Sequence, residues 1–267
     1  MKKISRRSFM AAAAVSVAAL ALTACGGFAS SAASSVASSA ASSEAASSAA
    51  AAELTTVEAG KLTMATNAAF PPYEMTTDAG EFEGIDVDTA KAIAEKLGLE
   101  LQIDDMDFDA ALLSVQQGKA DIAMAGITVT DERMAVMSFS DSYATGIQSI
   151  IVPEGSDIAS PDDLAGKKIG TQRGTTGYLY CSDDFGEDAV VAYDNGLTAV
   201  QALNNGQVDA VVIDNEPAKA YVESNPGLKI LDTSYAEEDY AIGMAKGSAL
   251  EDAVNKALEE LKADGTL

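Results

Sequence analysis

Two stretches of this sequence, ALLSVQQGKADIAMAG at residues 111–126 and AVQALNNGQVDAVVID at residues 199–214, share one pattern. Each begins with apolar residues at helical spacing, reaches a glycine that ends the helix, and continues through an aspartate, Asp121 or Asp209, into a short apolar strand. Alternating helices and buried strands predict an α/β fold. The repeat, with its copies 88 residues apart, suggests two similar lobes, although chance recurrence of so common a pattern is the alternative.

The two stretches also indicate where a ligand should bind. Gly126 and Asp214 occupy matching positions at the carboxyl ends of the two predicted strands. In open α/β sheets, ligands bind in the crevice outside these ends. We therefore expect the site at residues 126–133 and at Asp214.

The sequence before the first stretch continues the α/β pattern. Residues 61–66, KLTMAT, predict a strand, and residues 84–98, GIDVDTAKAIAEKLG, predict a helix that ends at Gly98. Asp86 stands where the N-cap of this helix is expected.

The first 53 residues predict export and tethering. Residues 1–25 contain basic residues, an apolar run and the ending LTAC, which resembles a bacterial lipoprotein signal with Cys25 as the lipidated residue. The motif SRRSFM also fits a twin-arginine signal, so the export route stays open. Residues 26–53 are almost wholly Ala, Ser and Gly, which predicts a flexible tether. We expect a lipid-anchored protein on the outer face of the bacterial cell membrane, or on the periplasmic side where there are two membranes.

Composition excludes several classes of function. The chain has 41 acidic and 17 basic residues and a net charge of −24, so nucleic acid and anionic lipid headgroups are poor partners. It has no histidine, which removes Ser–His and Cys–His triads and histidine-ligated zinc. No metal or other cofactor is expected. With Cys25 assigned to lipid, Cys181 has no intrachain disulfide partner and is expected to be a buried thiol.

Arg133 is placed where a helix should begin, in the segment GITVTDER. The helix dipole disfavours a cation there. A surface ion pair with Asp131 or Glu132 is one explanation. The other is a bidentate clamp for a carboxylate, made by the guanidinium with the backbone N–H groups and hydroxyls around Thr128.

A second set of residues could complete a site for a zwitterion. Residues 174–177, GTTG, end a strand before a predicted helix, and such helix starts bind anions through backbone N–H groups. This segment has no Walker lysine and no GxGxxG spacing, so a nucleotide is not expected. Asp214 could cap the following helix or could pair with a ligand ammonium. Phe70, in a loop before two prolines, and Phe108 could be ordinary core residues or could contact the ligand.

The motifs FPPYE, GEFEGIDVDTAKAIAEKLG, MDFDAALLSVQQGKADIAMAGITVTDER, FSDSY, DLAGKKIG and GTTG occur in this order from residue 61 onward. They resemble those of the polar amino-acid-binding proteins of bacterial ABC importers, the family 3 extracellular solute-binding proteins. The resemblance implies a two-lobed periplasmic-binding-protein-like (type II) clam with two hinge crossovers. It places lobe 1 at 61–147 plus 242–267 and lobe 2 at 153–235. It further implies a non-enzymatic monomer that captures a free α-amino acid and delivers it to the permease subunits.

The resemblance also assigns site residues. The family's clamp for the α-carboxylate falls on Arg133 with the backbone amides of Thr128 and Thr176. Its partners for the α-ammonium fall on Asp214, the Thr128 hydroxyl and the Gly126 carbonyl.

The remaining assignments concern the ligand side chain. The family's aromatic sandwich falls on Phe70 and Phe108, and selectivity is expected from Asn67, Tyr73 and Gln172. Members that bind basic or amide side chains commonly have an aspartate where this chain has Asn67. We therefore expect a polar neutral side chain rather than a cationic one.

Two alternatives and one departure accompany this resemblance. A cyclohexadienyl-type dehydratase can share the fold, but no pair of acid and base residues stands out near the site motifs. A ligand-sensing module of a receptor is the third possibility. The family usually continues past the DGT motif into another helix, whereas this chain stops at Leu267, so a shorter lobe 1 is expected.

Overall fold

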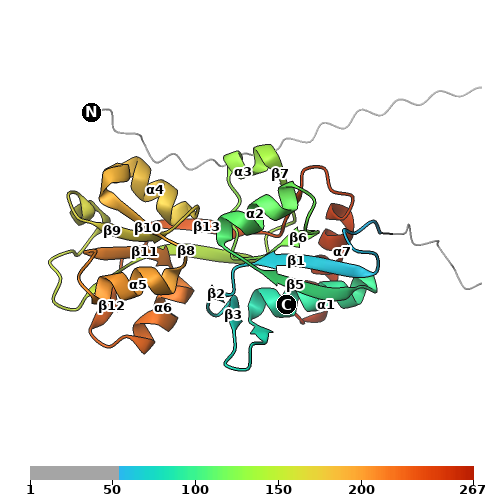
Figure 1. Ribbon diagram of the computed structural model, residues 1–267, viewed down its shortest axis with the longest axis horizontal. Coiled ribbons are helices and arrows are strands. Elements are labelled where there is room, and N and C mark those ends of the chain that lie inside the picture. The colour runs from blue at the N-terminus through green and yellow to red at the C-terminus, as the bar shows by residue number, and fades with distance from the viewer. Residues whose placement is uncertain (1–53) are drawn as a thin grey trace, which may run out of the picture. The chain divides into compact units, whose positions relative to one another are not determined.

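Two large β-sheets, each covered by helices, and one small sheet make up the part of the chain that the computed structural model describes, residues 54–267 (Figure 1). The predicted export signal, Cys25 and the tether at 26–53 lie outside the described residues. Between residues 54 and 267, no helix is long and apolar enough to cross a membrane. The predicted α/β fold is confirmed.

The first sheet has the strand order β5-β1-β6-β14-β7. Its strands are β1 (Lys61–Thr66), β5 (Glu100–Asp105), β6 (Ile122–Ala123), β7 (Met137–Phe139) and β14 (Gly243–Ala245). β1 is parallel to β5 and β6, whereas β14 is antiparallel to β6 and β7. The helices of this first half are α1 (Ile85–Leu97), α2 (Phe108–Gln116), α3 (Asp131–Val136) and α7 (Glu251–Asp264). A small sheet beside it contains β2 (Ala69–Phe70), β3 (Glu74–Thr76) and β4 (Phe82–Glu83).

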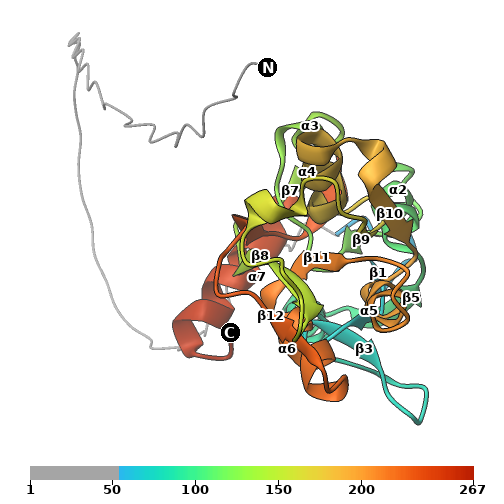
Figure 2. The ribbon, with the colours of Figure 1, turned by 90° about the vertical axis from the view of Figure 1, so that its left-hand side faces the viewer.

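The second sheet has the order β10-β9-β11-β8-β12, and β13 also pairs with β8. Its strands are β8 (Ala144–Pro153), β9 (Ile169–Gln172), β10 (Val190–Tyr193), β11 (Ala210–Asp214), β12 (Leu228–Ile230) and β13 (Ala236–Tyr240). The helices of this second half are η1 (Pro161–Leu164), α4 (Thr176–Phe185), η2 (Glu187–Ala189), α5 (Gly196–Asn204) and α6 (Asn215–Ser224). Figure 2 shows α4 on one side of this sheet and α5 and α6 on the other.

Separate apolar cores fill the two halves. In the first, Leu62 and Ile122 of the sheet pack with Leu258 of α7. In the second, Ile150 and Val212 of the sheet pack with Leu164 and other buried residues. A further apolar cluster joins the halves, because Phe70 and Tyr73 of the first half are buried with Tyr221 and other residues of the second. Each half thus has its own core, and the two halves share one apolar cluster where they meet.

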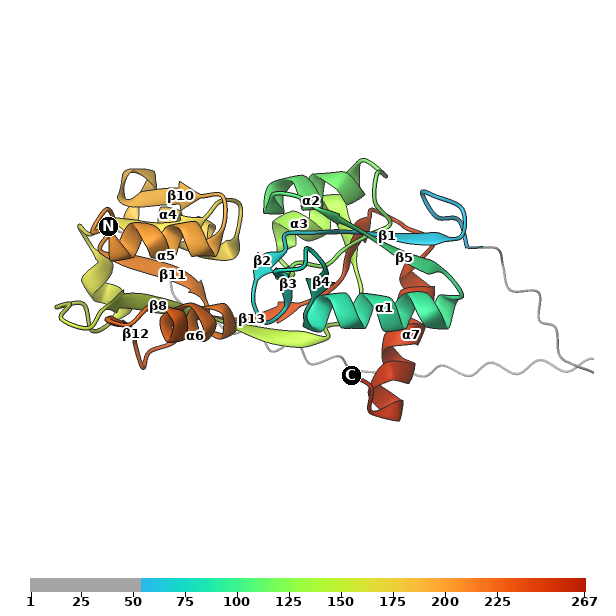
Figure 3. The same cartoon turned by 60° about the horizontal axis from the view of Figure 1, so that its bottom comes forward.

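The chain passes between the halves twice, before β8 and after β13 (Figure 3). These two strands pair antiparallel from Ala144 opposite Tyr240 to Gln148 opposite Ala236. Gly146 lies directly against the ring of Tyr240, and a Cβ atom at this position would come within 2.5 Å of the ring. The two crossovers therefore form one ribbon, packed so closely that residue 146 has no room for a side chain.

The aspartates of the repeated pattern have matching structural roles. Asp121 accepts a hydrogen bond from the backbone N–H of Thr63 at 2.8 Å, at the start of β1. Asp209 accepts one from the N–H of Lys168 at 2.8 Å, just before β9. Each aspartate thus fastens its own strand to the neighbouring parallel strand, so the sequence repeat reflects the same construction in both halves.

The predicted helix α1 is present and ends at Gly98, which adopts a left-handed conformation as expected. The predicted capping role of Asp86 is wrong. Gly84 is the N-cap, and the Asp86 side chain is fully buried. Its carboxylate accepts hydrogen bonds from the backbone N–H of Gly126 at 3.0 Å and from the hydroxyl of Tyr143 at 2.9 Å. The second position of the helix faces the interior, so Asp86 supports the loop after β6 instead of the helix end.

Gly84→Ala should destabilise the protein strongly. Gly84 has φ +128°, and a Cβ atom there would lie 2.2 Å from the backbone oxygen of Tyr73. We expect a loss on the order of 2 kcal/mol or more in the free energy of unfolding, measured by urea denaturation.

Gly80→Ala is the matched control for Gly84→Ala. Gly80 has φ +81° but nothing within 4 Å of its Cβ position. Gly80→Ala should lower the free energy of unfolding by only about 1 kcal/mol, the cost of a left-handed backbone conformation for alanine. Equal losses for the two variants would contradict the steric argument.

Candidate ligand-binding site

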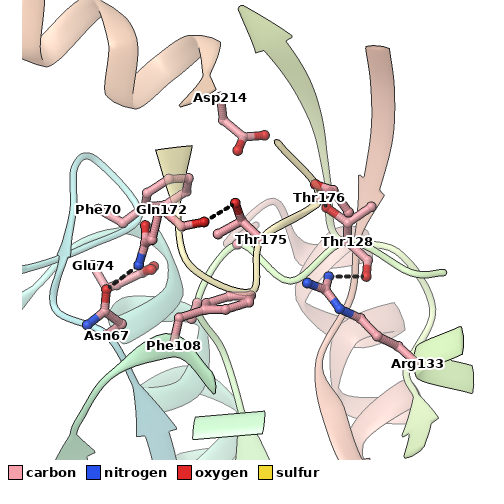
Figure 4. Close-up of a pocket in the computed structure, with 12 residues that line it drawn as sticks. Asn67, Phe70, Glu74, Phe108, Thr128, Arg133, Gln172, Thr175, Thr176 and Asp214 are labelled. Carbon is pink, nitrogen blue, oxygen red and sulfur yellow. Dashed lines mark hydrogen bonds between the residues drawn. The ribbon is translucent and has the colours of Figure 1, made fainter. Parts of the chain in front are cut away.

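One pocket lies between the two halves, at the carboxyl ends of strands from both sheets (Figure 4). Nine of the ten residues predicted for the site line this pocket, and Tyr73 is the exception. Its lining residues are Asn67, Phe70, Glu74, Phe108, Ala125, Gly126, Thr128, Arg133, Gln172, Thr175, Thr176 and Asp214. The structure therefore brings together residues that the sequence separates by more than a hundred positions.

Arg133 is buried at this pocket, with 8% of its surface exposed. It follows Thr130, the N-cap of α3, whose hydroxyl accepts a hydrogen bond from the Arg133 backbone N–H at 3.2 Å. The guanidinium donates to the carbonyl of Thr128 at 2.7 Å and to that of Gly174 at 3.1 Å, and it lies 5.3 Å from the ring centroid of Phe108. In residues 54–267 it forms no ion pair within 4 Å, so the surface-pair explanation does not apply.

The guanidinium keeps both its charge and free donors for an anion. Burial lowers the pKa of Arg133, and the charge of Glu238 opposes this shift. Because the ordinary arginine pKa is above 12, the side chain remains a cation at neutral pH. Two carbonyls occupy only part of its five N–H donors.

The second half contributes the start of α4. Thr175 is its N-cap and accepts a hydrogen bond from the backbone N–H of Tyr178 at 3.4 Å. Thr176 is the first residue of the helix, and its hydroxyl lies 3.5 Å from the hydroxyl of Thr128. The predicted helix start is confirmed, and Thr175 and Thr176 line the same pocket as Arg133. The first N–H groups of a helix have no acceptor within the helix and can bind an anion.

Asp214 stands at the N-cap position of α6, but its side chain makes no capping hydrogen bond. The carboxylate accepts hydrogen bonds from Gln148 Nε2 at 2.8 Å and from the hydroxyl of Tyr240. Burial, followed by the charge of Glu238, raises the pKa of Asp214 to about 7. A cation bound in the pocket would favour the ionised carboxylate.

Glu238 in β13 is a buried acid near this pocket that the sequence analysis missed. Its Oε2 accepts hydrogen bonds from the Thr128 hydroxyl at 3.1 Å and from Gln148 Nε2 at 3.0 Å. Strand alternation could have found it, because Glu238 lies on the same face as the buried Tyr240 two residues later.

The opposite side of the pocket is formed by polar and aromatic side chains. Gln172 Nε2 donates to Asn67 Oδ1 at 2.9 Å, and Asn67 Nδ2 donates to the carbonyl of Met106 at 2.8 Å. Tyr73, expected to contribute to selectivity, does not line the pocket. Its ring stacks on Phe70 with centroids 5.8 Å apart, and it supports the pocket wall from behind.

Glu74 is the second acid that the sequence analysis left without a role. It is completely buried, and neither carboxylate oxygen has a hydrogen-bond donor among the described residues. Figure 4 shows it beside Asn67, on the side of the pocket opposite Arg133. Its place directly after the loop FPPY, next to the assigned Phe70, was the available signal.

The sequence matches the family of bacterial extracellular solute-binding proteins, family 3, over residues 62–267. The chain belongs to this family. It is 33% identical over 217 residues to the arginine-binding extracellular protein ArtP of Bacillus subtilis, covering 78% of this chain and 83% of ArtP.

Two solved structures of ancestral arginine-binding proteins have the same fold. One, bound to arginine, is 44% identical with a TM-score of 0.74. The other, bound to glutamine, is 43% identical with a TM-score of 0.73. Each match covers 78% of this chain and 94% of the ancestral protein. The predicted type II periplasmic-binding-protein fold is confirmed. This family 3 protein is an extracellular or periplasmic amino-acid-binding protein for ABC transport, not an enzyme.

Asp214→Asn should stabilise the ligand-free protein at alkaline pH. Because the folded-state pKa of Asp214, about 7, exceeds its ordinary value of 3.8, ionisation of this group costs stability as pH rises from 3.8 towards 7. Urea denaturation of dialysed protein should show the variant more stable than the wild type by on the order of 1–3 kcal/mol at pH 8, with little difference at pH 4. A gain of the same size at both pH values would rule out the ionisation of Asp214 as its cause.

Proposed function

We propose that this family 3 protein binds an amino acid with a cationic side chain, arginine above all, and passes it to an ABC permease. The observation that carries the proposal is the buried carboxyl group of Glu74, which lines the pocket and has no donor among the described residues. A buried acid without a partner is costly, and a guanidinium supplies both the charge and the hydrogen bonds that it lacks.

The position of Glu74 suits an extended ligand. Arg133, the anchor we propose for the α-carboxylate, lies on one side of the pocket and Glu74 on the other (Figure 4). A long cationic side chain can reach from one to the other. The expectation of a neutral side chain rested on Asn67 alone, and Glu74 supplies the negative charge that Asn67 does not. The arginine named for ArtP and for one ancestral structure supports the same choice.

The roles assigned to the other predicted residues are part of this proposal. Thr128 and the start of α4 at Thr176 complete the carboxylate clamp. Asp214, with the Thr128 hydroxyl and the Gly126 carbonyl, receives the ammonium. Phe70 and Phe108 hold the aliphatic part of the side chain, and Asn67 and Gln172 lie beside its tip.

The domain boundaries and anchoring remain those predicted from the sequence. Lobe 1 comprises 61–147 plus 242–267 and lobe 2 comprises 153–235. The ribbon of β8 and β13 serves as the hinge. Binding then favours the closed arrangement, because Arg133 and Asp214 belong to different halves and a zwitterion needs both. The protein acts as a monomer, held through lipidated Cys25 at the outer side of the membrane.

Substrate choice can be tested with dialysed, ligand-free protein and the twenty amino acids plus citrulline, the neutral isostere of arginine. A thermal-shift screen should give the largest stabilisation with arginine, and calorimetry should show arginine binding at least about tenfold more tightly than citrulline. Tighter binding of glutamine or citrulline than of arginine would reject the cationic substrate and restore the neutral one.

Arg133→Ala should reduce arginine affinity by two orders of magnitude or more, because removing one partner of a buried charge pair costs about 2–5 kcal/mol. Arg133→Lys should restore little of the lost affinity, since the lysine ammonium lacks the planar pair of N–H donors that matches a carboxylate. Arg173→Ala is the control, because Arg173 is exposed and does not line the pocket. Near-native calorimetric affinity for Arg133→Ala would remove Arg133 from the clamp.

A further inference from the structure

We propose that Glu74 and Asp86 form a carboxyl–carboxylate pair that shares one proton, and that a cationic ligand side chain expels this proton whereas a neutral one leaves it in place. The inference rests on the proposed function, because it concerns how the same pocket distinguishes arginine from an uncharged amino acid. It assigns Asp86 a positioning role behind the side chain that contacts the ligand.

The geometry of the pair requires a proton. Both side chains are completely buried. Neither oxygen of Glu74, nor Oδ1 of Asp86, has a hydrogen-bond partner among the N–H and O–H groups of the described residues. The backbone N–H of Asp86 donates to the carbonyl of Tyr73 at 2.8 Å, so Asp86 lies beside the chain at Glu74. We infer that a hydrogen bond between the two carboxyl groups satisfies the oxygens left without a partner. Such a bond exists only when one of them carries a proton.

The other contacts place this proton on Glu74. Asp86 Oδ2 accepts two hydrogen bonds, from the N–H of Gly126 and the hydroxyl of Tyr143, and both favour its ionised form. Glu74 has no comparable donors. Burial raises the pKa of Asp86 to about 6, and burial together with the charge of Asp86 raises the pKa of Glu74 well above its ordinary value. At neutral pH the pair therefore carries one negative charge and one proton.

The groups that face Glu74 from the surrounding elements do not neutralise it. They are Asp86 of α1, Asp105 at the end of β5, Asp214 at the end of β11, Tyr73 before β3, Tyr143 before β8 and Tyr221 of α6. The cation of the pocket, Arg133, lies on its opposite side (Figure 4). Ionising Glu74 would thus add a second negative charge to an acidic, buried region. The guanidinium of a bound ligand can compensate this charge, whereas a neutral ligand side chain cannot.

The expected consequence is a pH-dependent preference. Arginine binding should release about one proton from the pair, so its affinity should rise by up to about tenfold per pH unit below the pKa of Glu74. The affinity for a ligand with a neutral side chain should not rise with pH through this proton. Protons released from Asp214 by the common α-ammonium group should be the same for both ligands and should cancel in the comparison.

Calorimetry of the full-length protein tests this directly. Arginine and citrulline are titrated at pH 7 and pH 8 in phosphate and in Tris, whose different ionisation enthalpies report the number of protons released. We expect arginine to release about one proton more than citrulline from the wild type, and about one more from the wild type than from Glu74→Gln. Equal release in both comparisons would overturn the inference while leaving arginine binding intact.

Two further variants separate the pair from a general effect of charge. Asp86→Asn keeps an acceptor for Gly126 and Tyr143 but removes the neighbouring charge, so arginine should release clearly fewer protons while still binding. Glu83→Gln removes an exposed acid on the adjacent strand β4 and should leave proton release unchanged. If arginine fails to bind the wild type while another amino acid binds, the proposed cationic substrate fails and the proton pair fails with it.

Discussion

The guanidinium of Arg133 is the interaction on which the arrangement of the site depends. It comes from the first half but donates a hydrogen bond to Gly174 of the second, so one buried cation joins both walls of the pocket. Its other hydrogen bond, to the carbonyl of Thr128, fixes the loop that also presents Gly126. A buried charge is tolerated only where dipoles and counter-charges surround it. The loops of both halves are folded to provide those groups.

The charged side chains at this pocket explain why it suits a zwitterionic ligand. Arg133 is surrounded by buried acids, among them Asp214 and Glu238, which share the donor Gln148. Burial raises the pKa of Asp214, and the charge of Glu238 raises it further. In the binding mode proposed above, an amino acid adds a carboxylate beside the cation and an ammonium beside the acids. The ligand therefore completes a charge pattern that the protein alone leaves unbalanced.

The sequence predicted correctly those features that neighbouring residues determine, such as the ends of helices and a buried strand. Helix α1 with its Gly98 stop, the start of α4 at Thr176 and the fully buried strand β11 all follow from local sequence signals. Arg133 was found because it contradicts such a signal. That anomaly is visible without any structure.

Residues whose role depends on distant segments were harder to predict. Asp86 carries the signature of a helix cap, but a loop and a tyrosine 40 and 57 positions further along the chain determine its actual partners. Glu74 received no role from the sequence, because its complete burial becomes visible only in the folded structure. Periodicity reports which face is buried, but not whether the buried polar atom finds a donor.

The contact between Gly146 and Tyr240 connects the crossover ribbon to the pocket. The backbone of Tyr240 pairs with Thr128 in the first half, while its hydroxyl donates to Asp214 in the second. The side chain of Tyr240, packed against Gly146, therefore lies within the ribbon and ends at the carboxylate of Asp214. In the hinge proposed above, a twist of the ribbon changes the position of this hydroxyl relative to Asp214, which couples opening of the two halves to the pKa of this carboxyl group.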